Sequence, residues 1–317
     1  MTDKISIDSK TAAFHFDLGM KYLIETDDIK HSGLARHHFE EASKLGHITA
    51  QYNLALLHEL GEAGPRDILK AMTYYSAIIA QTPFKNEDDR RAGAQAHYNL
   101  ARIHHLAIGV PRNIKMAQAL YEVAARAGIP HAQNNLALIL EEAGQTKRAM
   151  QLFQRAVERD YPEALLNLGL RMLDSDKISN SSRNQALEYL ERARRHKSGM
   201  ASHCLGHLFL RGIHDAADKK KGLAYLEEAA EWGHLMAIQD LVALYQDGIL
   251  VDRNFERAEF WRSRLPAEMP PGMASDFQPG ISGSSATHSI LSHEQLPNSA
   301  PHFNPTQAID WAEFMER

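Results

Sequence analysis

Histidine is the residue type through which this chain could most readily do chemistry. The sequence holds 18 histidines but a single cysteine, Cys204. Imidazole nitrogens bind transition metals and exchange protons near neutral pH, so neighbouring histidines are the first candidates for a metal or acid–base site. The doublets His37-His38 and His104-His105 point to different sides of a helix, because adjacent helical residues do not face each other. The spacing therefore predicts no metal site and no bound cofactor.

Serine and cysteine, the other potential nucleophiles, also lack an organised setting. Ser282 and Ser284 lie in a glycine-rich run, where no rigid element would hold a hydroxyl beside a base. Cys204 falls on a predicted helix face, which indicates a semi-buried thiol, and one cysteine cannot form an intrachain disulfide. The sequence contains no phosphate-binding loop and no paired carboxylates placed for acid–base work. We therefore expect a protein that is not an enzyme.

The charge and hydropathy of the chain exclude two classes of partner. The formal net charge is −5, whereas nucleic-acid binding needs clustered positive charge, so no nucleic acid is expected. The basic run at residues 192–197 is typical of a solvated helix end. No stretch approaches the roughly 20 apolar residues that span a bilayer, so no membrane insertion is expected. Residues 1–8 lack the apolar core of a secretory signal, and a cytoplasmic location is predicted.

An internal repeat predicts the elements that carry these side chains. A short motif, Asn-Leu followed by Ala or Gly, recurs with degenerate copies at intervals of 32 to 46 residues. Periods in this range are typical of stacked two-helix units. We therefore predict an all-α fold, a right-handed α-solenoid of about seven antiparallel helix pairs. The repeated leucines are Leu18, Leu54, Leu100, Leu136, Leu168, Leu205 and Leu241.

Each unit is predicted to contain a helix A, a loop and a helix B. In helix A a small residue follows the leucine directly and a bulkier residue stands four positions after it, so the three share one side of the helix. The small residue lets a partner helix come close. Helix B carries small residues seven positions apart, and in five units a good N-cap stands four residues before the first of them. The predicted caps are Asp67, Asn113, Ser182, Asp218 and Asn254.

The predicted boundaries divide the chain into a lead, a repeat array and a tail. The lead comprises residues 1–10, and the array spans residues 11–265. The longest interval between leucines contains the polar segment 81–90, which indicates a surface loop or an extended helix end. The approximate units are 11–49, 50–95, 96–131, 132–163, 164–200, 201–236 and 237–265.

The composition changes after the array. Seven of the 12 prolines and a glycine-serine run fall after residue 265, so residues 266–303 are predicted to be a disordered linker. Residues 304–317 could form a short amphipathic helix that presents Trp311, Phe314 and Met315. This segment is either a docking peptide or a disordered end. As a docking peptide it would act as an autoinhibitory arm, or as an oligomerisation arm in self-association.

The units resemble the Sel-one-like repeats, a class of the tetratricopeptide-like superfamily. The third unit carries the resemblance in residues 97–101 (His-Tyr-Asn-Leu-Ala), 109–111 (Gly-Val-Pro) and Gly128, and the seventh in Gly248 and Trp261. The fourth unit is shorter, and the chain lacks the cysteines that staple repeats in many secreted members. This lack of cysteines favours an intracellular relative, and the wide use of the family in bacteria implies a bacterial protein. Because some secreted members have been credited with hydrolysis, the resemblance also leaves a hydrolytic enzyme of unknown substrate as a remote alternative.

Helix A residues would line the concave side of such a solenoid and form a peptide-binding groove. The resemblance implies that the four asparagines that stand directly before a repeated leucine, Asn53, Asn99, Asn135 and Asn167, contact a bound peptide. The positions on either side of this motif vary among units, as selective recognition requires. In the alternative interpretation, the amides satisfy backbone groups between units and the tyrosines pack against the next unit. The predicted groove residues are Tyr52, Asn53, Tyr98, Asn99, Arg102, Asn135, Asn167, His203 and His207.

These features predict a protein–protein interaction adaptor or scaffold. It would hold a partner polypeptide in the concave groove of the solenoid and regulate or assemble a complex. The expected partner is another protein or a peptide.

Overall fold

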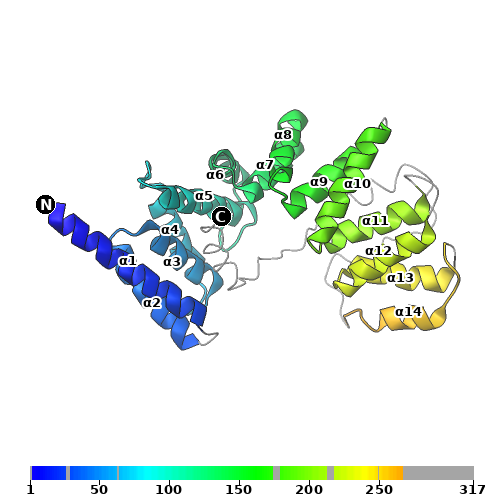
Figure 1. The fold of residues 1–317 in the computed structure, drawn as a ribbon, viewed down its shortest axis with the longest axis horizontal. Helices are drawn as coiled ribbons and strands as arrows, with labels where there is room; N and C mark the ends of the chain where they lie inside the picture. The colour runs from blue at the N-terminus through cyan, green and yellow to red at the C-terminus, as the bar shows by residue number, and fades with distance from the viewer. Residues whose placement is uncertain are drawn as a thin grey trace. The chain divides into compact units, whose positions relative to one another are not determined.

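The chain folds into consecutive α-helices in the computed structural model (Figure 1). The structure describes residues 2–25, 29–62, 64–173, 179–212, 218–248 and 250–266. These residues form fourteen helices and no β-strand, which confirms the predicted all-α class. The helices are α1 (Thr2–Glu25), α2 (Ile29–Lys44), α3 (Ile48–Leu60), α4 (Ile68–Ile79), α5 (Glu87–His105), α6 (Ile114–Arg126), α7 (Pro130–Glu142), α8 (Thr146–Val157), α9 (Pro162–Leu173), α10 (Asn180–Arg195), α11 (Gly199–Arg211), α12 (Lys219–Glu231), α13 (Leu235–Asp247) and α14 (Phe255–Arg262).

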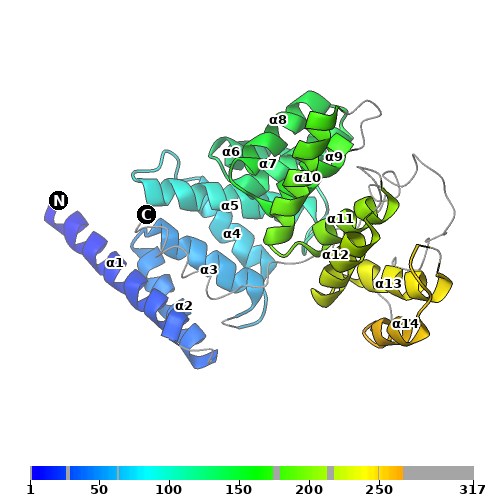
Figure 2. The same cartoon turned by 45° about the vertical axis from the view of Figure 1, so that its right-hand side comes forward.

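The helices fall into two compact units. Helices α1 to α7 belong to an N-terminal unit that ends at Gln145, and α8 to α14 belong to a C-terminal unit that begins at Thr146. Within each unit every helix packs against the next helix along the chain, as Figure 1 and Figure 2 show. Odd-numbered helices correspond to the predicted helix A and even-numbered helices to helix B. The result is a solenoid of helix pairs.

Side-chain caps fix the beginning of helix B in most repeats. Four predicted caps each accept a hydrogen bond from the backbone N–H three residues further on, at 2.9 to 3.0 Å. The predicted cap Ser182 is wrong, because α10 begins about one turn earlier than the repeat pattern indicates. Its cap is Ser179, whose Oγ accepts from the Ser182 N–H at 3.1 Å. The four confirmed caps are Asp67, Asn113, Asp218 and Asn254.

The core of each repeat is a stripe along helix B that combines small and large residues. In α2, Phe39 is fully buried between Ala35 and Ala42, which are themselves fully buried. Tyr75 of α4 and Tyr121 of α6 occupy the same position in the following repeats and are also fully buried. Burial of a side chain of this size contributes about 1.5–3 kcal/mol, and the contact recurs from repeat to repeat.

The small residue beside each helix A leucine allows helix B to approach closely. A Cβ atom at Gly206 of α11 would lie 2.6 Å from the Leu226 side chain of α12 and 3.1 Å from the Gly222 carbonyl oxygen. A Cβ atom at Gly222 would in turn lie 2.8 Å from the Gly206 carbonyl oxygen. The two helices therefore touch along their backbones, which only glycine permits at this separation.

The longest repeat interval contains an N-terminal extension of α5. This helix begins at Glu87, with Asn86 as its cap, after a short connection from α4. Phe84 of the connection folds onto Gly93, where an added Cβ would lie 2.1 Å from the phenyl ring. The sequence analysis left either a surface loop or an extended helix end for residues 81–90. The structure contains both, a short loop followed by an extended helix end. The predicted linker and the docking peptide with Trp311, Phe314 and Met315 lie outside the described residues.

None of the helices that the structure describes has the length and apolar character needed to cross a bilayer. The cytoplasmic location stays a prediction.

A pair of glycine substitutions tests the close approach of α11 and α12. Gly206→Ala is expected to lower the melting temperature, because the added methyl group overlaps Leu226 and overpacking costs about 1–3 kcal/mol. Gly33→Ala in α2 is the matched control, since its Cβ would meet nothing within 4 Å. It should raise the melting temperature slightly through its helix propensity, worth about 1 kcal/mol. Thermal unfolding followed by circular dichroism compares the two, and equal melting temperatures would contradict the packing argument.

Candidate functional site

Two predicted groove residues, Tyr52 and Asn99, belong to a polar network inside the N-terminal unit. The Asn99 amide of α5 donates to the hydroxyl of Tyr52 in α3, at 3.2 Å, and to the hydroxyl of Tyr75 in α4, at 3.1 Å. Asn99 is buried and Tyr52 is half-buried. Burial raises the pKa of Tyr52, so this phenol stays neutral. The Asn99 amide thus joins three helices through side-chain hydroxyls, and not through the backbone groups that the alternative interpretation of the asparagines expected.

The third member of this region, Arg102, forms a buried ion pair. Its guanidinium bonds Glu59 of α3, whose other carboxylate oxygen accepts from the Tyr75 hydroxyl at 2.9 Å. The side chain of Glu59 is 4% exposed and that of Arg102 is 13% exposed. Burial alone would lower the pKa of Arg102, but the adjacent Glu59 raises it. The pair is therefore charged and links the second repeat to the third.

Asn53 differs from Asn99 in what its amide contacts. It is half-buried in α3, and its Nδ2 donates to the sulfur of Met20 in α1 at 3.3 Å. A thioether sulfur is a weak acceptor. The Asn53 carbonyl oxygen accepts no hydrogen bond from the described residues. The Asn53 NH2 group therefore meets only a weak acceptor, whereas the Asn99 NH2 group donates to two hydroxyl oxygens.

The residue before the asparagine position contacts an aromatic ring of the next repeat in three places. The ring of Phe16 stacks on that of His47 at 4.5 Å, and the ring of His203 stacks on that of His234 at 4.9 Å. The rings of Tyr98 and His131 are 5.5 Å apart and tilted by 56°. The His47 and His234 rings also cap α3 and α13, because each Nδ1 accepts a backbone N–H three residues on. These aromatic positions thus contribute to contacts between repeats.

The remaining predicted groove residues differ in exposure. Asn135 is half-buried in α7 and donates to the Tyr121 hydroxyl at 3.2 Å. Asn167 is half-buried in α9, where Arg171 bonds its oxygen atoms. His203 and His207 of α11 are 3% and 9% exposed, so they lie in the interior and not on an open face. The structure brings together Tyr52, Asn53, Asn99 and Arg102 on α3 and α5, which contact each other.

The interior position of His203 and His207 results from a partner that the sequence analysis missed. Both Nε2 atoms lie 2.6 Å from Oδ2 of Asp240 in α13. Burial lowers the pKa of His203, even though Asp240 opposes this effect. Their spacing of four residues places both histidines on one helical face, and Asp240 stands in the column that holds asparagine in other repeats. The spacing of the histidines and the aspartate in the asparagine column are the two sequence features that could have predicted this cluster.

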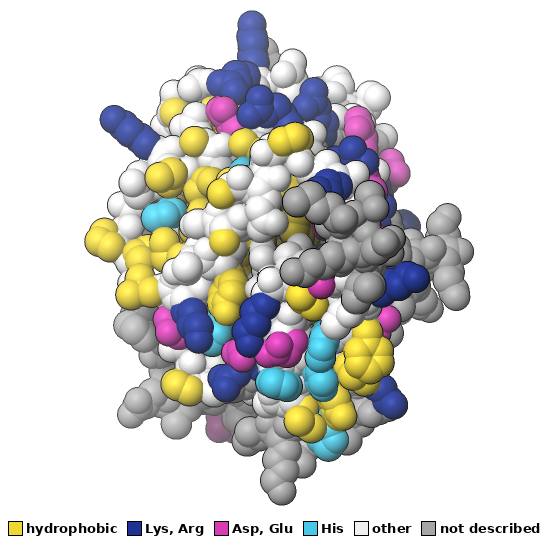
Figure 3. Space-filling view, turned by 90° about the vertical axis from the view of Figure 1, so that its left-hand side faces the viewer, with side chains coloured by type: hydrophobic (Ala, Val, Ile, Leu, Met, Phe, Trp, Pro, Cys, Tyr) yellow, Lys and Arg dark blue, Asp and Glu magenta, His cyan; other side chains and the backbone are white. Residues whose placement is uncertain are grey.

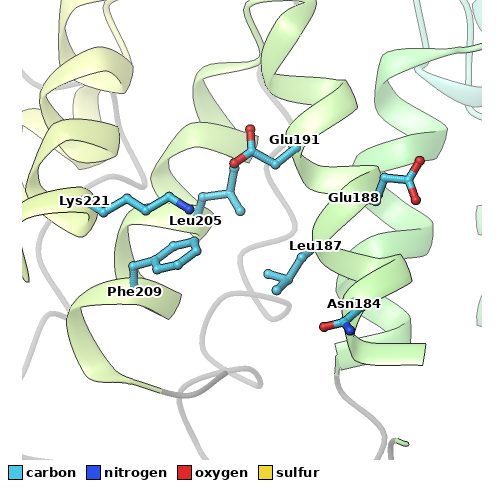
Figure 4. A pocket seen from close by; sticks show the side chains of 7 residues that line it. All are labelled: Asn184, Leu187, Glu188, Glu191, Leu205, Phe209 and Lys221. Atoms are coloured by element: carbon cyan, nitrogen blue, oxygen red, sulfur yellow. The ribbon is translucent and has the colours of Figure 1, made fainter. Parts of the chain in front are cut away.

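A cavity of about 400 Å³ lies among α10, α11 and α12 in the C-terminal unit (Figure 4). Leu187 and Leu205 supply buried apolar surface. The ammonium of Lys221 lies 3.9 Å from the centre of the Phe209 ring, in a cation–π contact. Two glutamates and an asparagine complete the lining, so an apolar base is combined with a charged rim. The lining residues are Asn184, Leu187, Glu188, Glu191, Leu205, Phe209 and Lys221.

The cavity carboxylate Glu191 is held in its charged form. It accepts hydrogen bonds from the Tyr225 hydroxyl and from Arg194, the latter at 2.8 Å. Burial would raise the pKa of Glu191, but these two hydrogen bonds lower it below its usual range. A general acid needs the opposite shift, so this glutamate is suited to structure and binding. Cys204 is buried as well, and burial raises the pKa of its thiol to about 12.

The face of the molecule seen in Figure 3 carries histidine side chains gathered with hydrophobic and acidic ones. In α1 and α2, the Nδ1 atoms of His15 and His38 lie 3.0 Å apart, and Tyr22 stacks on His38 at 5.5 Å. Burial and then the charges of His15 and His37 lower the pKa of His38. Phe14 beside them is 60% exposed.

The geometry of paired helices, small-residue contacts and capped turns agrees with a single family. The Sel1 repeat matches seven consecutive stretches of the chain, residues 13–47, 48–81, 94–129, 130–161, 162–198, 201–234 and 236–261. The chain belongs to the Sel1 repeat family. Sel1 repeats typically form non-enzymatic scaffolds that bind proteins. The comparison with curated proteins gave no match.

Solved structures resemble this Sel1 repeat protein in fold. A Sel1 repeat protein from Oxalobacter formigenes is 22% identical, with a TM-score of 0.65, and the match covers 80% of this chain and 99% of that one. A protective antigen of uropathogenic Escherichia coli strains with an SLR fold is 19% identical, with a TM-score of 0.45 over 83% of this chain and 63% of that one. The immunity protein Pa5087 from Pseudomonas aeruginosa is 17% identical, with a TM-score of 0.46 over 69% of this chain and 81% of that one.

The buried ion pair of the Sel1 repeat protein predicts a large stability effect. Arg102→Met should lower the free energy of unfolding by about 3–5 kcal/mol, because it leaves the Glu59 carboxylate buried without its partner. The double variant Arg102→Met with Glu59→Gln should lose less than the sum of the two single losses. Arg257→Ala removes an ion pair to Glu227 in which Arg257 is 54% exposed, and should cost at most about 1 kcal/mol. Urea unfolding measures all four variants, and additive losses would contradict the predicted coupling.

The lowered pKa of Glu191 predicts a pH dependence of stability. A carboxyl group whose pKa is lower in the folded state stabilises the fold above its unfolded pKa, near 4.3, and loses this contribution as pH falls through the folded pKa. The stability difference between the native chain and Glu191→Gln should therefore be largest near pH 7 and shrink below about pH 4. Glu188→Gln is the control, since Glu188 makes no hydrogen bond to the described residues. Urea unfolding at several pH values checks this, and a pH-independent difference would contradict it.

Proposed function

We propose that this Sel1 repeat protein is a non-enzymatic scaffold that binds an extended segment of a partner polypeptide. The segment would lie along the helix A residues of the N-terminal unit, in the groove that the repeat pattern predicts. Backbone groups of an extended peptide need donors and acceptors, which side-chain amides supply irrespective of the peptide sequence. Partner capture of this kind would allow the protein to regulate or assemble a complex.

The observation that carries the proposal is the unused hydrogen-bonding capacity of Asn53. Its carbonyl oxygen accepts nothing from the described residues, and its amide meets only the sulfur of Met20. The neighbouring Tyr52 is half-buried and offers an aromatic surface next to the same position. Tyrosine is a frequent anchor in protein interfaces because it combines apolar area with a polar end. The pair Tyr52 and Asn53 is therefore the centre of the proposed peptide site.

The other predicted groove residues divide between contact and support. Tyr98 and Asn135 are half-buried on α5 and α7 and would contact the peptide further along the N-terminal unit. Asn167 lies on α9 of the C-terminal unit and is not assigned to this peptide site. The Asn99 amide donates to two tyrosine hydroxyls, and the Arg102 guanidinium is paired with Glu59. These two residues would support the surface by fixing α3 against α5. His203 and His207 face Asp240 in the interior, so we do not assign them a direct contact with the peptide.

The cavity among α10, α11 and α12 is suited to a single large apolar side chain of a partner. Leu187 and Phe209 would contact such a side chain above the fully buried Leu205, while Lys221 and Glu191 would bond polar groups beside it. A pocket of this kind anchors an interface, because an apolar residue that fills it loses its contact with water. The same partner could therefore have a second, independent contact on the C-terminal unit.

Two asparagine variants separate binding from stability. Peptides selected on the full chain from a library of random linear peptides serve as probes, and fluorescence polarisation measures their affinity. Asn53→Leu should weaken binding about tenfold, which corresponds to about 1.4 kcal/mol, with little change in melting temperature. Asn99→Leu should instead lower the melting temperature, because it removes two buried hydrogen bonds.

A third variant controls for surface effects. Leu69 lies on α4, where its side chain is 65% exposed. Leu69→Ser should therefore leave both affinity and stability unchanged. Selected peptides that bind Asn53→Leu as tightly as the native chain would place the peptide site elsewhere. A selection that enriches no peptide would count against binding of extended segments altogether.

A further inference from the structure

Two histidines and an aspartate converge in the interior of the C-terminal unit. His203 and His207 lie one turn apart on α11, and Asp240 faces them from α13. Each Nε2 lies 2.6 Å from the same carboxylate oxygen, Oδ2, and the two Nε2 atoms are 3.2 Å apart. The side chains are 4%, 11% and 10% exposed. Three side chains with metal-binding atoms thus meet at one point that is largely shielded from water.

The repeat architecture explains why these residues meet. A spacing of four residues places His203 and His207 on the same side of α11, with Leu205 on another side. Asp240 stands directly before Leu241, at the position that holds asparagine in the middle repeats. In the third repeat this position bonds tyrosine hydroxyls, whereas Asp240 meets two imidazoles. The exchange of an amide for a carboxylate turns a hydrogen-bonding position into a potential anionic ligand.

We propose that His203, His207 and Asp240 bind a divalent transition-metal ion, for which Zn²⁺ is the natural probe. Two imidazole nitrogens and one carboxylate oxygen are a frequent ligand set for such ions. Bonds of about 2.0–2.1 Å in tetrahedral geometry place ligand atoms roughly 3.3 Å apart, which the two nitrogen atoms already match. The carboxylate oxygen has to withdraw by roughly 0.7 Å from each nitrogen, which a small rotation of the Asp240 side chain achieves.

The proton positions are compatible with this exchange. In the absence of an ion, a neutral imidazole that donates to Asp240 carries its hydrogen on Nε2. A metal needs the lone pair of Nε2, so that hydrogen moves to Nδ1 through a change of tautomer and the ring stays neutral. Both states keep the imidazole and the carboxylate intact, and no oxidant or reductant is involved. Among the described residues, Asp240 has no lysine or arginine as an ion-pair partner, so the ion would supply the missing positive charge.

The surroundings hold the ligands in place. His234 stacks on His203 with ring centres 4.9 Å apart, and its Nδ1 accepts the Ala237 N–H at 3.3 Å. This ring therefore orients His203 while its own Nδ1 is already occupied. With three ligands from the protein, the fourth position of a tetrahedral ion is available to water or to a side chain of a partner. The bound ion would connect α11 to α13 and stiffen the junction between the sixth and seventh repeats.

Other polar clusters of the described chain are less suited to a metal. His15 and His38 bring two Nδ1 atoms within 3.0 Å, but no third ligand of the described residues joins them. His196 bonds Asp160 at 2.6 Å, yet Arg192 already supplies a positive charge to the same carboxylate. In the part of the chain that the structure describes, the cluster of His203, His207 and Asp240 alone joins three such side chains.

Calorimetric titration of the full chain with Zn²⁺ tests the proposal. One ion is expected to bind per chain and to raise the melting temperature, because a ligand that binds the folded state stabilises it. Asp240→Asn and His207→Gln should each weaken binding by more than about 100-fold, since even residues that only support metal ligands change affinity 10–100-fold. The matched control is Asp17→Asn, which changes the corresponding residue of the first repeat, where the side chain is exposed. It should leave Zn²⁺ affinity unchanged.

Two further measurements cover the remaining outcomes. His38→Gln removes the histidine pair of α1 and α2. Loss of Zn²⁺ binding in this variant, with binding retained in Asp240→Asn, would overturn the proposal. Absence of binding to the native chain would overturn it as well. If the α11 and α13 variants do not fold, the Co²⁺ spectrum of the native chain decides. Intense visible bands are expected for a four- or five-coordinate ion, whereas the weak bands of a six-coordinate hydrated ion would refute the site.

Discussion

The structure depends on how closely helix A and helix B of one repeat approach each other. At α11 and α12, Gly206 and Gly222 bring the two backbones into contact, and a single added methyl group would overlap Leu226. Large side chains at the neighbouring positions, such as Phe39 and Tyr75, then fill the interior completely. Small residues at the contact and large residues beside it therefore set the separation of the two helices in a repeat.

Polar residues at the junctions between repeats make the interior selective. In the N-terminal unit the Asn99 amide and the ion pair of Arg102 with Glu59 join α3, α4 and α5. In the C-terminal unit the corresponding region holds two histidines and an aspartate. A buried polar group is costly unless it finds its partner, so these junctions favour a particular order of repeats over any other. Asn53 differs from these residues, because its side-chain amide contacts only the sulfur of Met20.

Much of the fold could be predicted from the sequence, because helix periodicity and caps are local. The recurring leucines, Asp67 and Asn113 indicate where helices lie and begin without any knowledge of tertiary contacts. Contacts between repeats could not be predicted as well. Arg102 reads as a groove residue because its partner Glu59 is 43 residues away and looks like an ordinary solvated carboxylate. His203 and His207 read as groove residues for the same reason, since Asp240 enters only when α13 packs beside α11.

The capping histidines give the array an additional property. The imidazole of His47 accepts the Ala50 N–H in the first turn of α3 and at the same time stacks on Phe16 of α1. One ring therefore takes part both in starting a helix and in docking that helix on its predecessor. Nucleation of a helix is unfavourable by itself. A repeat whose capping ring is positioned by the preceding repeat is therefore expected to fold after that repeat is in place. Folding along the chain should consequently be more cooperative than in arrays whose caps are small and independent of the preceding repeat.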